Sequence, residues 1–344
     1  METGHKFSSG VIVGKFYPFH KGHALLIRTG RAQCEKLTVL ACSLPSETIP
    51  GAIRASAIQE AFPDVRVIHI SEILPQYPNQ HKDFWTIWVN VVKSNVPDVD
   101  VLFTSENYGD PFATYLGVPH ICVDKPRRTV PISGTQIRNR LTENWHFLMP
   151  GMQRYFQRRI CVIGPESTGK TTLTRGLITT FPDSYLIQEF GRQYVTSMST
   201  THLAAYDFLR IAQGHAQLER EAPPNSRLVI SDTDAFTTKT FYDLYRSRNK
   251  FVHDPIVYRD LCKFVEEESY DLYLLTNIDI PWIQDGQRDF PHSRTQIFNT
   301  FLNFVSDKPH YVIQGSTPML RLQLAYHHIS CEIKKWDAQI PLTL

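Results

Sequence analysis

The sequence predicts an α/β protein of two domains, each built on a doubly wound parallel sheet. Short β-rich runs alternate with longer helical stretches along the 344 residues, which is typical of parallel strands covered by helices on both faces. The alternation restarts with a fresh apolar strand after residue 150. The length also suits two domains that each bury a core of their own. We therefore place the domains at 1–154 and 155–344.

In the first half, five apolar runs are expected to form strands, and the stretches between them are expected to form helices. The first strand is expected at 11–17, followed by a helix over 20–34. Later strands are expected at 36–43, 65–72, 99–106 and 119–124, and further helices near 52–62, 83–95 and 111–117.

The second half is expected to open after a cluster of breaker residues, Met149-Pro150-Gly151-Met152. Its first strand runs straight into a glycine-rich turn. Strands are expected at 158–164, 184–190, 227–232, 270–276 and 310–315.

Composition excludes several classes of protein. Apolar residues make up 42% of the chain and charged residues 20%, which is typical of a globular protein, and a net charge of +2 gives no support for a nucleic-acid partner. The apolar runs are too short to cross a bilayer, so no membrane partner is expected. Six dispersed cysteines without a C-x-x-C pair, and a polar N-terminus, favour the cytoplasm. Self-association into a homo-oligomer stays open.

A complete phosphate-binding loop follows the first strand of the second half. Residues 164–171 read Gly-Pro-Glu-Ser-Thr-Gly-Lys-Thr, which matches G-x-x-x-x-G-K-[ST] between an apolar strand and a helix. Lys170 is expected to reach the β- and γ-phosphates of ATP, and Thr171 to hold Mg²⁺. The other residues expected to bind this ATP are Gly164, Glu166, Ser167, Thr168, Gly169 and Thr172.

Acids and arginines further along are candidates for the chemistry at this loop. Asp232 ends an apolar run and is expected to organise Mg²⁺, whereas Asp234 is expected to contact substrate. Glu189 ends another strand candidate and could accept the proton of an attacking hydroxyl. Arg192 and Arg288 are candidates for a mobile segment that neutralises the transferred phosphoryl group. The alternatives are an ordinary strand that ends at a solvated acid for Asp232, helix capping or a surface salt bridge for Glu189, and solvated surface positions for the arginines.

A GTPase would use the same kind of loop, but its guanine-selecting run is missing. That run normally reads N/T-K-x-D after a late strand. Here the strand leads into Thr276-Asn277-Ile278-Asp279, which has no lysine.

A second phosphate site is predicted where the first strand of the chain meets its first helix. Gly14-Lys15-Phe16-Tyr17-Pro18-Phe19-His20-Lys21-Gly22-His23 places two histidines beside the free N–H groups of a helix start, so an anion is expected there. His20 and His23 can donate hydrogen bonds to charge that develops on phosphorus. Metal ligation is the alternative. ATP contacts are also expected from Gly14, Lys15, Phe16 and Gly22.

The run Ile132-Ser133-Gly134-Thr135-Gln136-Ile137-Arg138 supports this reading. Ser133 and Thr135 offer hydroxyls at a helix start and Arg138 a cation one turn on, which could hold the leaving pyrophosphate. Alone, the run could be an ordinary N-cap. Together the two segments resemble the (H/T)-x-G-H and I-S-x-T-x-x-R signatures of the nucleotidylyltransferase superfamily, which implies a Rossmann-like domain. The third position of the I-S-x-T run is Gly134, which has no hydroxyl, so Ser133 and Thr135 are the hydroxyl residues of the run.

Two tryptophans, Trp85 and Trp88, stand in the helix expected at 83–95. A cationic nicotinamide ring stacks well on indole. Two indoles at this spacing are also common in a core, so both interpretations stay open.

The two halves in this order resemble the NadR-type bifunctional proteins of NAD salvage, over essentially the whole chain. The further matches are Val123-Asp124 ahead of Arg127-Arg128, and the runs 187–194 and 231–238. The resemblance implies a P-loop kinase that phosphorylates nicotinamide riboside, and an adenylyltransferase that turns nicotinamide mononucleotide and Mg·ATP into NAD and pyrophosphate. Some members also carry a DNA-binding domain, for which the roughly ten residues before the first strand are too few.

Two other functions stay open. One is adenylyl transfer to a different phosphate acceptor, such as phosphopantetheine, coupled to another small-molecule kinase. The other is a non-catalytic NAD or ATP sensor that keeps its binding loops.

Overall fold

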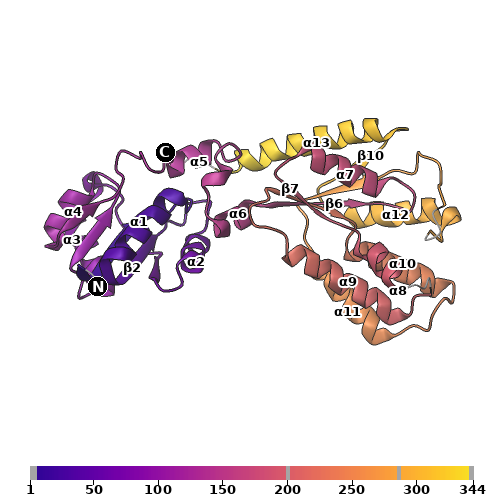
Figure 1. The fold of residues 1–344 in the computed structure, drawn as a ribbon, viewed down its shortest axis with the longest axis horizontal. Helices are drawn as coiled ribbons and strands as arrows, with labels where there is room; N and C mark the ends of the chain where they lie inside the picture. Colours follow the sequence, from indigo (N-terminus) through magenta and orange to yellow (C-terminus); the bar gives the residue numbers. More distant parts are fainter. Residues whose placement is uncertain (1–5, 199–201, 285–287, 341–344) are drawn as a thin grey trace. The chain divides into compact units, whose positions relative to one another are not determined.

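The computed structural model describes residues 6–198, 202–284 and 288–340 of the chain. These form two compact units (Figure 1). Residues 6–156 group with 335–340 in unit 1, and residues 157–334 form unit 2. None of the helices in the described residues combines the length and the apolar composition needed to span a membrane.

Unit 1 contains a five-stranded parallel sheet in the order β3-β2-β1-β4-β5. The order reverses between β1 and β4, which makes the carboxyl end of β1 a topological switch point, where α/β sheets usually bind ligands. The strands are β1 (Phe7–Gly14), β2 (Cys34–Cys42), β3 (Arg66–Ile70), β4 (Val101–Thr104) and β5 (His120–Cys122). The helices are α1 (Lys21–Gln33), α2 (Gly51–Ala61), α3 (Phe84–Asn95), α4 (Gly109–Leu116), α5 (Gly134–Asn139) and α6 (Pro150–Phe156), with short 3₁₀ turns at Pro78–Gln80 and Trp145–Phe147.

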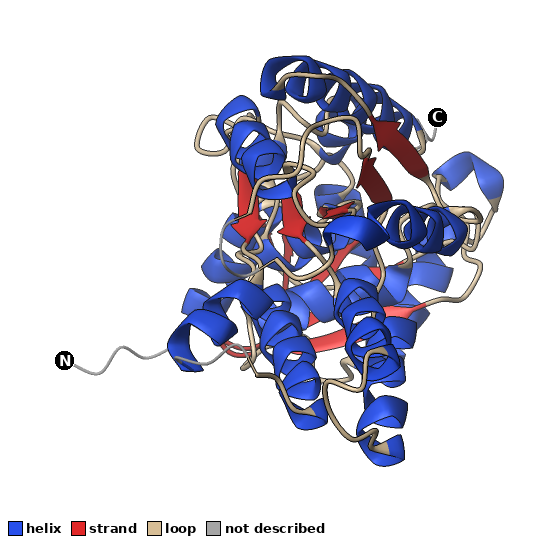
Figure 2. Ribbon diagram, turned by 90° about the vertical axis from the view of Figure 1, so that its right-hand side faces the viewer, coloured by secondary structure: helices blue, strands red, loops and turns tan. Residues whose placement is uncertain are grey.

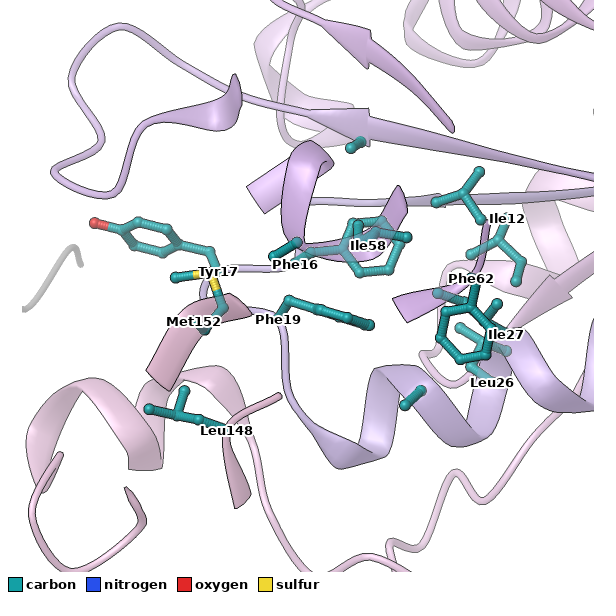
Figure 3. Close-up of a cluster of buried hydrophobic side chains, with 14 of the residues drawn as sticks. Ile12, Phe16, Tyr17, Phe19, Leu26, Ile27, Ile58, Phe62, Leu148 and Met152 are labelled. Atoms are coloured by element: carbon teal, nitrogen blue, oxygen red, sulfur yellow. The ribbon is translucent and has the colours of Figure 1, made fainter. Parts of the chain in front are cut away.

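Alternate residues of β1 enter two different cores, because successive side chains of a strand point to opposite faces. Val11 and Val13 join the cluster beneath α3 and α4, whereas Ile12 joins the cluster beneath α1 and α2. The second cluster continues past the end of β1 into Phe16, Tyr17 and Phe19 (Figure 3). The turn after β1 is therefore fixed by its own buried aromatic side chains.

Unit 2 has a second parallel sheet, in the order β10-β9-β6-β8-β7, with β6 at its centre. Helices lie on both sides of these strands (Figures 1 and 2). The strands are β6 (Arg158–Ile163), β7 (Ser184–Ile187), β8 (Leu228–Asp232), β9 (Leu272–Thr276) and β10 (His310–Ile313). The helices are α7 (Lys170–Thr180), α8 (Phe190–Met198), α9 (Ala205–Arg220), α10 (Ala235–Ser247), α11 (Pro255–Glu267), α12 (Arg294–Val305) and α13 (Pro318–Ala338), with a 3₁₀ turn at Pro291–Ser293.

The predicted fold class is confirmed, and three local predictions are wrong. The strand expected at 184–190 ends at Ile187, so Glu189 lies between β7 and α8 instead of in the sheet. The first strand begins at Phe7 and ends at Gly14, so residues 15–17 lie in the turn instead of the sheet. The cluster around Pro150 does not break the structure but begins α6. Proline suits the first turn of a helix, where its missing N–H leaves no hydrogen bond unmade.

Candidate functional site

In unit 1, His20 is the N-cap of α1 and organises the turn after β1. Its Nδ1 accepts hydrogen bonds from the backbone N–H groups of Gly22, at 3.1 Å, and His23, at 3.4 Å. Because Nδ1 is the acceptor, the neutral ring carries its proton on Nε2. The His20 ring also stacks on the His23 ring, with centroids 3.7 Å apart. The structure thus brings together the two histidines that the sequence predicts.

Both imidazoles are held neutral. Burial, together with the positive charge of Arg127, lowers the pKa of His20 to about 3. Burial, the neighbouring His20 and Arg127 lower the pKa of His23 well below its usual range. Neutral rings next to a cation act as hydrogen-bond donors in a positive environment, which suits a polyphosphate. Arg127 belongs to one of the runs that carry the family resemblance, but its local sequence does not mark it as a site residue.

Arg138 joins the second motif to the first. Its guanidinium donates to the Tyr17 carbonyl oxygen at 2.5 Å and to Thr135 Oγ1 at 3.2 Å. Ser133 is the N-cap of α5, where its hydroxyl accepts from Gln136 N at 3.2 Å. The capping alternative is therefore true of Ser133, and it does not conflict with a contact to phosphate.

Gly134 has a steric reason to replace a hydroxyl residue. A Cβ built on Gly134 would collide with the Tyr17 carbonyl oxygen, which is the same atom that accepts from Arg138. Backbone cannot yield as a flexible side chain can. The close approach of α5 to the turn after β1 therefore requires glycine here.

The two tryptophans of α3 are packed differently. The Trp85 ring stacks on Tyr115, with centroids 5.6 Å apart and planes 15° from parallel, and Tyr115 is 59% exposed. The Trp88 indole N–H donates to the Pro75 carbonyl oxygen at 3.0 Å. Both rings also pack against the buried cluster beneath α3. Each indole is thus partly buried in the core, and a contact of either one with nicotinamide stays a prediction.

In unit 2, the loop between β6 and α7 has the backbone conformation of a phosphate cradle. Gly164 has φ +147° and Gly169 has φ +78°, where side chains are disfavoured. A Cβ on Gly164 would also collide with Thr276. Lys170 Nζ donates to the carbonyl oxygens of Gly164 and Pro165, at 2.9 and 3.0 Å, so its ammonium lies over the loop.

Asp232, at the end of β8, is held directly against this loop. Its Oδ2 accepts from the Thr171 hydroxyl at 2.6 Å, while its buried Oδ1 has no hydrogen-bond partner. Burial, reinforced by the charge of Glu189, raises the pKa of Asp232 to about 6. A buried carboxylate oxygen without a donor, next to a threonine hydroxyl, fits a divalent cation.

A cavity opens beside the loop, and its lining includes both polar and aromatic residues. Glu189 and Arg192 line it and form an ion pair at 3.2 Å. Several lining residues have no role in the sequence analysis, because nothing in their local pattern marks them. They are Val195, Leu203, Phe208, Ile211, His215, Phe241 and Tyr245.

Glu166 and Ser167 bind protein groups in this structure. Glu166 accepts from the backbone N–H of Phe290 at 3.0 Å, and Ser167 Oγ accepts from Ile283 N at 2.8 Å and from the Arg288 guanidinium at 3.3 Å. The predicted segment around Arg288 thus lies beside the phosphate loop. The residues 285–287 that precede Arg288 lie outside the described part of the chain.

Asp234 is placed where it caps a helix. Its Oδ1 accepts from the backbone N–H of Thr237 at 2.7 Å and from the Thr237 hydroxyl at 2.6 Å, at the start of α10. The side chain is buried, and it is not among the described residues that line the cavity. Asp234 is therefore the N-cap of α10, a role that its local sequence did not suggest, and its placement gives no support to the expected substrate contact.

Known proteins resemble this chain in both units. A family model described as an AAA domain matches residues 159–319. The trifunctional NAD biosynthesis/regulator protein NadR of Escherichia coli (strain K12) is 28% identical over 311 residues, which cover 84% of this chain and 73% of that protein. The nicotinamide-nucleotide adenylyltransferase of Thermococcus kodakarensis is 27% identical over 158 residues, which cover 44% of this chain and 82% of that protein.

Solved structures of NadR share the fold. A crystal structure of NadR in complex with NR matches with a TM-score of 0.69 at 22% identity, over 94% of this chain and 95% of that one. A second, in complex with NAD and AMP-PNP, matches with a TM-score of 0.69 at 21% identity, over 94% and 96%.

Proposed function

We propose that this chain, which is homologous to the NadR proteins, makes NAD from nicotinamide riboside in two ATP-dependent steps. Unit 2 phosphorylates the 5′-hydroxyl of the riboside and forms nicotinamide mononucleotide. Unit 1 then transfers the adenylyl group of a second ATP to that mononucleotide and releases pyrophosphate. ATP and the riboside are substrates, and NAD is the product.

The kinase step is assigned to the cavity beside the phosphate loop. Lys170 and the loop N–H groups bind the β- and γ-phosphates, and Glu189 accepts the proton as the riboside hydroxyl attacks the γ-phosphorus. Thr171 and Asp232 would hold Mg²⁺, which neutralises charge on the phosphates when it is bound. Arg192 pairs with Glu189 at 3.2 Å and can orient that carboxylate.

Adenylyl transfer is assigned to the turn after β1. A phosphate oxygen of the mononucleotide attacks the α-phosphorus of ATP, so no covalent enzyme intermediate is needed. The Nε2–H of His20 and the His23 ring donate to the charge that develops there. Arg138 with Thr135 holds the departing pyrophosphate at the start of α5.

One observation supports this assignment above the others. The described chain contains two separate sites built for polyphosphate, each at a helix start and each inside its own compact unit. A single-site nucleotide sensor does not need both. The aromatic residues that line the unit 2 cavity also suit a nucleoside with a flat ring as the substrate of the kinase.

The test is incubation of the full chain with nicotinamide riboside and Mg·ATP, with mononucleotide, NAD and pyrophosphate measured over time. Lys170→Ala should abolish riboside phosphorylation and leave adenylyl transfer to supplied mononucleotide intact, and His23→Ala should do the reverse. Turnover of phosphopantetheine in place of the mononucleotide would support the other acceptor. Binding of ATP without any product would support the sensor.

A further inference from the structure

The buried carboxylate of Glu47 connects the turn after β1 to α2. Glu47 is only 3% exposed at its side chain, and each of its oxygens faces a different cation. Oε1 lies 3.0 Å from Lys15 Nζ, and Oε2 lies 2.5 Å from the Arg54 guanidinium. Arg54 in turn donates to the backbone carbonyl oxygen of Lys15 at 2.5 Å. Lys15 is thus held at its side chain by Glu47 and at its backbone by Arg54.

The same guanidinium braces the turn at a second point. Arg54 lies over one ring, Tyr17, at 5.0 Å from the centroid, and Arg138 lies over the same ring at 4.5 Å. The Tyr17 hydroxyl is fixed by Thr48, whose Oγ1 lies 2.7 Å away. These contacts join α2, the turn after β1 and α5 into one network.

Stability alone does not explain why these charged side chains are buried. Arg54 is 1% exposed, and a well-packed apolar side chain of similar volume is often at least as stabilising as a buried ion pair. Burial opposes ionisation of Glu47, but the hydrogen bonds from Lys15 and Leu44 and the charge of Arg54 lower its pKa. Glu47 is therefore a carboxylate, and it pairs with the ammonium of Lys15, whose side chain is 43% exposed.

Lys15, which this network fixes, stands directly after β1, in the turn that leads to the histidine pair at the start of α1. Lys15 directly precedes Phe16, whose left-handed backbone, with φ +51°, reverses the chain. The Phe16 ring lies 4.9 Å from the His23 ring. A triphosphate bound at the start of α1 would lie at the same turn as this cation.

We propose that Glu47 and Arg54 are positioning residues of adenylyl transfer, which hold the Lys15 ammonium where it stabilises charge on the reacting phosphate. Neither residue touches substrate. The inference rests on the function proposed for unit 1. A failure of this inference can be told from a failure of the proposed function, because the wild-type chain must first make NAD from supplied mononucleotide and ATP.

The test compares kcat and KM for Mg·ATP in adenylyl transfer. Glu47→Gln keeps the shape and removes the charge, so kcat should fall about tenfold or more as Lys15 loses its orientation. KM for Mg·ATP should stay the same or fall, because a negative charge near the triphosphate has been removed. Glu60→Gln is the matched control: Glu60 lies on α2, as Arg54 does, and forms an exposed pair with Arg154, and both activities should be unchanged.

A merely structural network would give a different result. It would lower the melting temperature of Glu47→Gln without changing kcat in the remaining folded protein, and that outcome would overturn the proposal. If Glu47→Gln does not fold, Glu47→Gln with Arg54→Met removes both buried charges, and kcat should still be low. In a double-mutant cycle, adding Glu47→Gln to Lys15→Met should cost nothing further in kcat. Additive losses would contradict an action through Lys15.

Discussion

The hydroxyl of Thr171 donates to Asp232 Oδ2 at 2.6 Å, and this hydrogen bond joins the first turn of α7 to the end of β8. The contact places the one hydroxyl of the phosphate loop that should bind Mg²⁺ against a carboxylate whose other oxygen is buried without a partner. Proteins rarely leave such an atom unsatisfied outside a functional site.

Asp232→Asn should therefore lower riboside phosphorylation by about 100-fold or more, because the amide is a poor ligand for Mg²⁺. Adenylyl transfer by unit 1 should be unchanged, and both rates can be measured in one preparation. Asp307→Asn, at a carboxylate whose side chain is 81% exposed, is the control and should affect neither rate. Unimpaired phosphorylation by Asp232→Asn would remove this residue from the metal site.

Gly134→Ala should impair adenylyl transfer and destabilise unit 1. The new methyl group meets the Tyr17 carbonyl oxygen, so α5 must move and Arg138 must give up its hydrogen bond to that oxygen. We expect a loss of about 1–3 kcal/mol in the free energy of unfolding, together with a fall in kcat for NAD formation of about tenfold or more.

Gly117→Ala is the control that separates the loss of stability in Gly134→Ala from the loss of adenylyl transfer. Gly117 has φ +78° at the end of α4 but open space where a Cβ would stand. Its replacement should cost about 1 kcal/mol of stability and leave adenylyl transfer intact. Equal losses of activity in both variants would show that Gly134 acts only through stability.

The stability of unit 1 should fall as the pH falls from 7 to 5. The pKa of His20 is about 3 in the folded chain and 6.5 in the unfolded chain, so within this window the unfolded state binds more protons. Acidification therefore favours unfolding, by about 2 kcal/mol from His20 alone. The measurement is urea unfolding at the two pH values, followed by tryptophan fluorescence.

His20→Asn keeps an N-cap residue and removes the titrating ring, so its loss of stability between pH 7 and 5 should be smaller by that amount. His81→Asn, at an exposed histidine of the same unit, should behave like the wild type. An identical pH dependence in His20→Asn would contradict the assignment of the neutral state to this ring.

Trp85→Ala should raise KM for nicotinamide mononucleotide about tenfold if its indole stacks on the cationic ring. Trp88→Phe should instead cost about 1 kcal/mol of stability, because it removes the hydrogen bond to the Pro75 carbonyl oxygen while keeping an aromatic ring. Steady-state kinetics and thermal melting of the two variants decide this. The opposite pattern would assign the nicotinamide contact to Trp88.

Local motifs made much of this molecule predictable. The glycines of the phosphate loop demand the positive φ values seen at Gly164 and Gly169, so the sequence alone places that loop between β6 and α7. The same holds for the helix start at His20, where the residue that is predicted to bind phosphate is also the N-cap of α1. The predicted resemblance to the NadR proteins is confirmed by homology over 84% of the chain.

Features that depend on distant partners were not predictable. The start of β1 was not predicted because Ser8 and Ser9 interrupt the apolar run. In the fold, their backbone N–H groups donate to the carboxylate of Asp100, which is distant in the sequence. Glu47 has an ordinary surface composition around it, and only the fold brings Arg54 to its side. The grouping of 335–340 with unit 1 is likewise a tertiary fact, carried by buried Ile340 in the cluster that also contains Ile12.

The central claim is that one chain has two independent ATP sites, and calorimetric titration with a non-hydrolysable ATP analogue in the presence of Mg²⁺ tests it most directly. The wild-type chain should bind two equivalents. Lys170→Ala and Arg138→Ala should each bind one, and the double variant none. A single equivalent in the wild type, or the loss of both equivalents in either single variant, would contradict the account.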